Sequence, residues 1–195
     1  MHETLLPECT RIGFSHEAAR KTLLANGWRE IEVLETWQGP APRLEPSEFP
    51  TVRRALPEDE AALCRIAVSA FKFDRLHVDP EIPKALADEA KRKWVRDAMK
   101  DPERTIEVAL GNGPIGFLIW KGTRLNRRNA IIIDLLAVDP SMARRGVARQ
   151  LVATAANSSG FRVMRAGTQA VNEPARKFYK SLGMKPISYA RTFHR

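Results

Sequence analysis

A glycine-bearing turn after an apolar stretch is the first feature of the sequence that could do chemistry. Residues 131–138 are typical of a buried strand, and the chain then opens a helix with Gly146 and Ala148 at its start. A helix start exposes backbone N–H groups without intrahelical partners and carries partial positive charge, so it can hold a diphosphate. Small residues let a ligand approach the backbone, and Arg144 and Arg145 add positive charge. The alternative is an ordinary turn with two solvated arginines.

A second candidate site lies in residues 167–183, where Asn172 precedes a predicted helix and Tyr179 follows on that helix. An unperturbed phenol, with a pKa near 10, is protonated at neutral pH and can donate that proton, so Tyr179 is a candidate general acid. Asn172 can bind a ligand or cap the helix, because its amide both donates and accepts. The alternative for Tyr179 is packing against Ala175 and Phe178.

Together the two segments resemble the GCN5-related N-acetyltransferase (GNAT) superfamily. Members carry a Gln/Arg-x-x-Gly-x-Gly/Ala loop after the fourth strand and an Asn-x-x-Ala-x-x-x-Tyr-x-x-x-Gly-Phe segment after the fifth. Residues 143–148 match the loop except at its first position, which is alanine here. The second segment matches at Asn172, Ala175, Tyr179 and Gly183, with methionine in place of the final phenylalanine.

The resemblance implies an α/β protein of the GNAT fold, with a mixed central sheet flanked by helices and a short N-terminal helix-strand appendage. It also implies an N-acetyltransferase that moves an acetyl group from acetyl-CoA, its cosubstrate, to a primary amine. In the family the backbone of the fourth strand pairs with the pantetheine arm. The cofactor-binding residues implied here are Leu136, Ala137, Val138, Arg144, Arg145, Gly146, Val147, Ala148, Asn172 and Tyr179.

A candidate base and candidate acceptor contacts come from other parts of the chain. Asp134 lies four residues before Val138, so strand alternation puts both on one face, where Asp134 could take a proton directly or through water. The alternative is a buried Asp134 paired with a neighbouring arginine. Residues 69–80 are also similar to nucleotide-sugar N-acetyltransferases of the dTDP-fucosamine type, which implies an amino-sugar acceptor contacted by His77 and Asp79. Two alternatives stay open. The acceptor could be a peptide, polyamine or antibiotic amine, or the protein could be a noncatalytic acyl-CoA-binding module.

The elements that must position these residues follow from periodicity and turn signals. We expect a partial N-terminal helix-strand segment over residues 1–38, a proline-rich linker over 39–50 and the acetyltransferase domain over 51–195. The predicted helices are 16–26, ended by Gly27, then 61–70, 85–99 with Trp94 and Val95 on its apolar side, 145–158 and 173–182. The predicted strands are 31–37, a strand through Val52 and Arg54, 105–110, 115–121, 129–138, 162–168 and a last strand through Tyr189.

Composition and charge limit the remaining classes. A chain of 195 residues with 44% hydrophobic and 28% charged residues is typical of one soluble α/β domain with a short appendage. The net charge of +9 would steer a polyphosphate ligand such as coenzyme A. Nucleic acid would satisfy that charge too, but the arginines are scattered, so we expect no nucleic-acid partner. The two cysteines match no metal-binding spacing, so we expect no metal site and a cytoplasmic location. We also expect no membrane partner, and a homodimer stays open.

Overall fold

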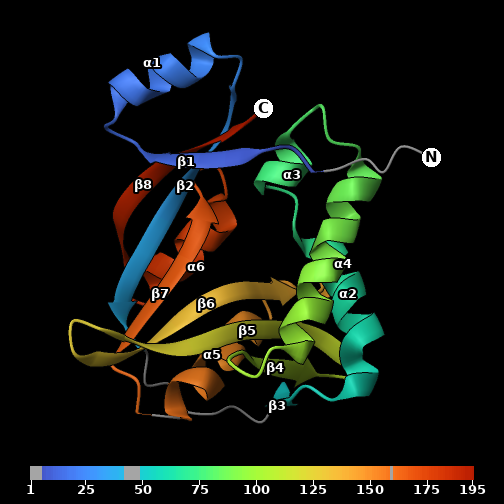
Figure 1. Ribbon diagram of the computed structural model, residues 1–195. Coiled ribbons are helices and arrows are strands. Elements are labelled where there is room, and N and C mark those ends of the chain that lie inside the picture. The colour runs from blue at the N-terminus through green and yellow to red at the C-terminus, as the bar shows by residue number, and fades with distance from the viewer. Residues whose placement is uncertain (1–5, 42–48, 159) are drawn as a thin grey trace.

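A single eight-stranded sheet organises the chain in the computed structural model, which describes residues 6–41, 49–158 and 160–195 (Figure 1). Its strand order is β1-β8-β2-β7-β6-β5-β4-β3. Every neighbouring pair with a described register is antiparallel except β6 and β7, which run parallel. The strands are β1 (Cys9–Gly13), β2 (Arg29–Pro40), β3 (Thr51–Arg54), β4 (Thr105–Leu110), β5 (Pro114–Leu125), β6 (Arg128–Val138), β7 (Val163–Gln169) and β8 (Lys185–His194).

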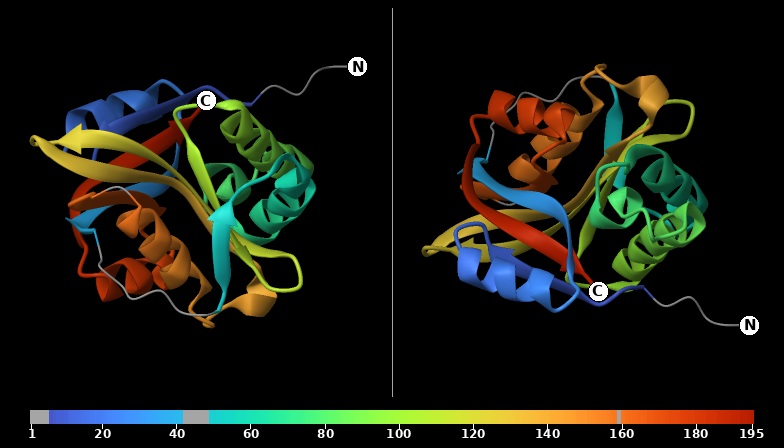
Figure 2. Two further views of the ribbon diagram at one scale, coloured as in Figure 1. Left: turned by 90° about the horizontal axis from the view of Figure 1, so that it is seen from below. Right: turned by 90° about the horizontal axis from the view of Figure 1, so that it is seen from above.

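Helices cover both faces of this mixed sheet (Figure 2). One face carries α2 (Glu60–Ala70), α3 (Arg75–Val78) and α4 (Lys84–Lys100), and the other carries α5 (Val147–Asn157) and α6 (Glu173–Ser181). Strand β6 lies between the two layers, which explains its continuous apolar run. Ile131 and Ile133 pack into the cluster beneath α5 and α6, whereas Leu135 and Ala137 pack into the cluster beneath α2 and α4.

The N-terminal segment is part of the sheet. Helix α1 (Glu17–Ala25) confirms the helix predicted over 16–26 to within a residue at each end, and Gly27 adopts the predicted left-handed conformation, with φ of 79°. Strand β2 then pairs with β7 on one side and with β8 on the other. It is longer than the predicted strand 31–37, and β1 was not predicted.

The division into segments at 38 and 50 stays a prediction. Strand β2 reaches the first two residues of the predicted linker, and residues 42–48 of that linker lie outside the described part of the chain.

The other predicted elements are confirmed with ends shifted by a few residues, and α3 is added between α2 and α4. One side-chain prediction is wrong. Val95 is buried as expected, but Trp94 is 42% exposed. Its ring lies over the ammonium of Lys91, with 4.9 Å from Nζ to the ring centroid, and Lys91 itself is buried. The cation therefore holds the ring at the surface of α4.

Candidate active site

Strands β6 and β7 separate at the middle of the sheet. Their parallel register runs from Ala130 opposite Val163 to Ile133 opposite Ala166, and no further pair is formed. Beyond this point β6 pairs only with β5, and β7 pairs only with β2. Among the described residues, the edge of β6 from Leu136 to Val138 therefore has no strand partner on the β7 side. An unpaired edge of this kind can take an extended ligand by backbone hydrogen bonds.

A bulge in β6 lies at the point of separation. Ile133 pairs with Trp120 and Leu135 pairs with Ile119, so Asp134 is the extra residue. The bulge shifts the alternation by one. As a result Leu136 and Val138 pack toward α5, as Ile131 and Ile133 do before it. The expectation that simple alternation relates Asp134 to Val138 is therefore wrong.

The carboxylate of Asp134 is already engaged. Its Oδ2 accepts a hydrogen bond of 2.8 Å from Nε of Arg104, and Arg104 also contacts Asp101. The hydrogen bond to Asp134 raises the pKa of Arg104 above its ordinary value. This is the arginine-paired alternative expected from the sequence. A role for Asp134 as a base stays a prediction.

The turn before α5 has the backbone geometry expected of an anion cradle. Gly146 is the N-cap of α5 with φ of 80°, and Arg144 is also left-handed, with φ of 61°. A hydrogen bond of 3.0 Å runs from the N–H of Gln150 to the carbonyl of Gly146, so the preceding N–H groups of the first turn have no helical partner. A Cβ built on Gly146 would meet no atom within 4 Å. The backbone is thus open to an approaching ligand.

The side chains around this turn differ in their exposure to solvent. Arg144 and Arg145 are exposed, Val147 is buried and Ala148 is partly buried. The two arginines have no ion pair to a described carboxylate, which leaves their charge available for a ligand or for water. Val147 belongs to the same core cluster as Tyr179, so α5 and α6 bring the two sequence motifs to one face of the sheet.

Asn172 and Tyr179 occupy the first and last parts of α6. Asn172 is its N-cap, and Oδ1 accepts from the N–H of Ala175 at 3.3 Å, as the capping alternative predicts. Tyr179 is 5% exposed, and its ring centroid lies 6.2 Å from that of Trp37. Burial raises the pKa of Tyr179 to about 12. The phenol is therefore protonated at every pH at which the protein would work, and it can only begin a reaction as an acid.

His77 and Asp79, the predicted acceptor contacts, are buried in an ion-pair network. His77 lies 2.6 Å from Asp74 through Nδ1 and 3.1 Å from Asp88 through Nε2. Asp79 accepts from Arg29 at 2.6 and 3.1 Å and lies 2.7 Å from Nδ1 of His194. Its side chain has no exposed surface. These contacts join α3 to β2 and β8, and contact with an acceptor stays a prediction.

A buried network beneath α6 was missed by the sequence reasoning. Glu35 is 2% exposed, and its Oε2 accepts from Nε1 of Trp37 at 2.8 Å and from Nε of Arg176 at 3.0 Å. Trp37 in turn contacts Tyr179. The sequence signal for this network is that Glu35 and Trp37 are two residues apart in a strand, which places both side chains on one face. Nothing local to that strand shows that α6 covers it.

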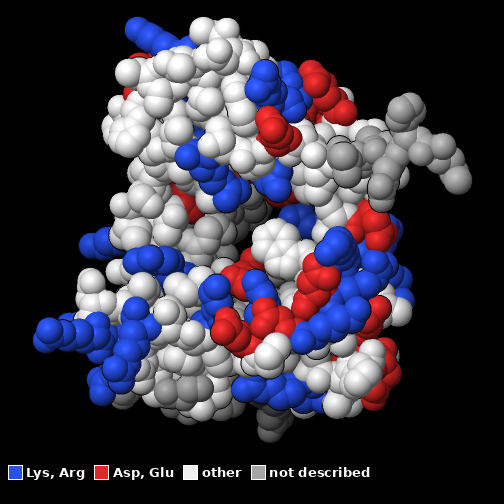
Figure 3. All heavy atoms as spheres, viewed as in Figure 1, with Lys and Arg blue, Asp and Glu red and all other residues white. Residues whose placement is uncertain are grey.

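Charges on the face seen in Figure 3 are interleaved, and the surface is hollowed between the half of the sheet containing β2 and β7 and helix α4. On α4 the interleaving follows from ion pairs one turn apart, such as Lys93 with Asp97. Within the described ranges, no helix combines the length and apolar character required to cross a membrane.

An α/β sheet whose strands separate beside an open glycine turn at a helix start offers a ligand-binding crevice, and comparison with known proteins gives the family. The chain belongs to the acetyltransferase (GNAT) family, whose model matches residues 61–184. It is accordingly an acyltransferase with the GNAT fold, in a family that generally uses acetyl-CoA. Among curated proteins, none matches the chain.

Solved structures agree with this fold. A conserved protein of unknown function from Staphylococcus epidermidis has a TM-score of 0.71 at 12% identity, covering 95% of this chain and 71% of that one. A GCN5-related N-acetyltransferase from Sphaerobacter thermophilus has a TM-score of 0.61 at 20% identity, covering 96% of this chain but 58% of that one. One from Kribbella flavida has a TM-score of 0.60 at 16% identity, with coverages of 95% and 67%.

Proposed function

We propose that the protein is an N-acetyltransferase that moves an acetyl group from acetyl-CoA to a primary amine. The observation that carries the proposal is the unpaired edge of β6 from Leu136 to Val138, which leads directly to the open turn at Gly146. An extended thioester with a diphosphate at its far end needs both features in this order. The bound thioester supplies an activated acyl group, and the chain supplies its orientation.

The donor site uses main chain more than side chains. The N–H and C=O groups of residues 136–138 pair with the amides of the pantetheine arm. The first turn of α5 receives the diphosphate on its free N–H groups, and Arg144 and Arg145 supply additional charge. Asn172 caps α6 through its oxygen and keeps its amide donor for the arm or a nearby carbonyl.

Tyr179 acts as the general acid in this proposal. The amine attacks the acyl carbon, the carbonyl oxygen gains negative charge, and the leaving thiolate takes a proton from the phenol. With a pKa of about 12, the phenol keeps its proton until the leaving group develops charge. The amine must arrive neutral, and the proton that it loses after attack passes to water or to a base such as Asp134.

The acceptor approaches from the hollow between β7 and α4, on the face opposite α5 (Figure 3). An amino sugar carried on a nucleotide is the acceptor that the closer sequence resemblance suggests, with peptide, polyamine and antibiotic amines as alternatives. No name among the similar structures described above specifies an acceptor. The acceptor's identity therefore stays a prediction.

The test is acetyl-CoA consumption by the purified protein with a panel of amines that includes nucleotide-linked amino sugars. We expect turnover with at least one member of the panel. Binding of acetyl-CoA without any turnover would instead support a noncatalytic acyl-CoA-binding module. Failure to bind acetyl-CoA would contradict the proposal altogether.

A further inference from the structure

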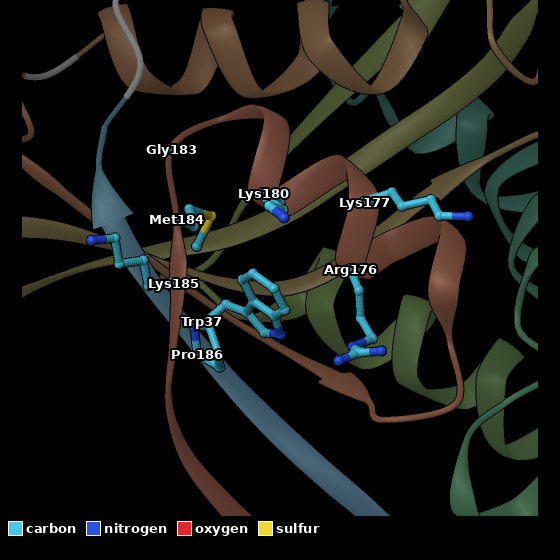
Figure 4. Close-up of a pocket in the computed structure, with 8 residues that line it drawn as sticks. All are labelled: Trp37, Arg176, Lys177, Lys180, Gly183, Met184, Lys185 and Pro186. Atoms are coloured by element: carbon cyan, nitrogen blue, oxygen red, sulfur yellow. The ribbon is translucent and has the colours of Figure 1, made fainter.

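A pocket of about 480 Å³ opens between α6 and the start of β8 (Figure 4). Four basic side chains line it, namely Arg176, Lys177, Lys180 and Lys185, and among the described residues no acidic side chain does. We propose that this pocket is a second anion site, which binds a phosphorylated small molecule other than the thioester donor. The inference goes beyond the proposed function and does not depend on acyl transfer.

The basic residues of the pocket differ in how their charge is used. Lys177 forms an exposed ion pair of 2.9 Å with Glu173, one turn earlier on α6. Lys180 and Lys185 are both exposed, and in the described part of the chain neither lies within ion-pair distance of a carboxylate. Two of the residues that line the pocket therefore carry a positive charge without a described protein counter-ion, which favours an anionic ligand.

Arg176 is held in position for a bidentate contact. Its Nε donates to the buried carboxylate of Glu35 at 3.0 Å. Among residues 6–41, 49–158 and 160–195, none accepts from its two terminal nitrogens. In Figure 4 the guanidinium lies beside Trp37 at the pocket wall. A guanidinium anchored at one nitrogen keeps a planar pair of donors that fits two oxygens of a phosphate.

The floor of the pocket is apolar, with Trp37, Met184 and Pro186. A ligand that fills the pocket therefore has an apolar or aromatic body as well as a phosphate. A nucleoside diphosphate combines the two. None of the pocket residues is assigned to the donor, since neither the Gly146 turn, nor the unpaired edge of β6, nor Asn172 or Tyr179 lines the pocket. The donor and this ligand would therefore contact different residues.

The pocket is connected to Tyr179 by contacts that an occupant would disturb. Oε2 of Glu35 accepts from both Arg176 and Nε1 of Trp37, and the ring of Trp37 packs against Tyr179. An anion that binds the guanidinium of Arg176 would change the electrostatic environment of the Glu35 carboxylate, to which Arg176 donates. The indole N–H of Trp37 should report this change.

The experiment is a calorimetric titration with ADP of protein saturated with coenzyme A, so that the donor site is filled. The wild type should bind ADP, and the K180Q/K185Q double variant should bind it about tenfold more weakly, since two charge-assisted contacts are lost. The matched control is Lys21→Gln, an exposed lysine on α1. Nitrogen-15 spectra of the indole N–H groups, assigned with Trp37→Phe, should show the Trp37 resonance shifting as ADP is added.

The outcomes separate this proposal from the proposed function. Equal ADP binding by the wild type and the double variant would overturn it, as would ADP binding that disappears once coenzyme A is present. If coenzyme A itself does not bind, the proposed function fails, but weaker ADP binding by the double variant alone would still support the pocket. An unmoved Trp37 resonance during ADP binding would overturn the placement of the ligand.

Discussion

Tyr179 shows how burial can determine what a residue is able to do. The sequence motif suggested a general acid, and the position of the ring against Trp37 removes the phenol from bulk water. Burial disfavours the phenolate and raises the pKa of Tyr179 to about 12. An exposed tyrosine would also hold its proton at neutral pH, so burial strengthens the hold on the proton while making the phenol a weaker acid toward the thiolate.

Replacing Tyr179 by phenylalanine should therefore reduce kcat by about 100-fold, the order of magnitude of general acid catalysis, with little change in KM for acetyl-CoA. The chain has one other tyrosine, Tyr189, which is 42% exposed, and Tyr189→Phe is the matched control. Steady-state kinetics with the identified amine would measure both. An unchanged kcat in Tyr179→Phe would remove the phenol from the mechanism.

Asp79 has a structural role that is measurable through pH. Burial alone would raise the pKa of this carboxyl, but hydrogen bonds from Arg29, His194 and the N–H of Glu81 outweigh it and lower the pKa to about 2. Because the pKa is lower in the folded state, the stabilisation is complete above the unfolded value near 4. It is lost as pH falls from about 4 to about 2.

Asp79→Asn should lower the free energy of unfolding by about 2 kcal/mol at pH 7, as the pKa difference implies. The difference from the wild type should shrink as the pH of a urea titration is lowered toward 2. Asp97→Asn is the control, because the Asp97 carboxylate is exposed and forms a surface ion pair with Lys93. A loss of stability in Asp79→Asn that is the same at pH 7 and at pH 3 or below would contradict this account.

At the scale of elements, local patterns predicted most helices and strands but not their assembly. The helix around 147–157 follows from its apolar spacing, and the turn at Gly146 follows from its glycine and its place after a buried strand. The insertion of β2 between β7 and β8 could not be predicted, because it joins residues more than a hundred positions apart. The bulge at Asp134 depends on pairing with β5, so the sequence of β6 alone does not show it.

The left-handed backbone at Gly146 and the capping at Asn172 were the most predictable features of the candidate site, because both are local properties. The acceptor side was the least predictable. His77 and Asp79 were predicted to contact the acceptor, yet their side chains pair with groups from other strands and helices and have little or no exposed surface. Long-range charge pairing of this kind leaves no periodic signal.

Strand β2 should contribute strongly to the stability of the sheet through Trp37, which is 5% exposed and packs into the core. Trp37→Ala should cost about 3–5 kcal/mol of unfolding free energy, the usual range for a buried large aromatic. Trp94→Ala, at an exposed tryptophan, should cost distinctly less. Urea unfolding of the two variants would measure this. Equal losses would mean that the N-terminal segment is not part of the core.

At the scale of the whole molecule, the separation of β6 and β7 divides the sheet into two halves (Figure 1). Beyond the gap, β6 stays paired with β5 and β7 stays paired with β2. Each of the two strands at the gap therefore keeps a strand partner on its other side. The net charge of +9 adds a long-range attraction for a polyphosphate donor. In the proposed function, a broad electrostatic attraction acts together with the free backbone groups of the β6 edge and of the turn at Gly146.

Two glycines allow the central claim to be tested with a matched pair. Gly146 and Gly27 have φ of 80° and 79°, and a Cβ on either would meet no atom within 4 Å. Alanine at either position should cost roughly 1–2 kcal/mol of stability through the left-handed backbone. Only at Gly146 does the added methyl group enter the space proposed for the diphosphate.

The most direct measurement is therefore calorimetric titration of acetyl-CoA into the wild type, Gly146→Ala and Gly27→Ala. We expect the wild type and Gly27→Ala to bind alike and the Kd of Gly146→Ala to rise about tenfold or more, since backbone contacts to a charged group are lost. Equal binding by both variants, or no binding by the wild type, would contradict the account.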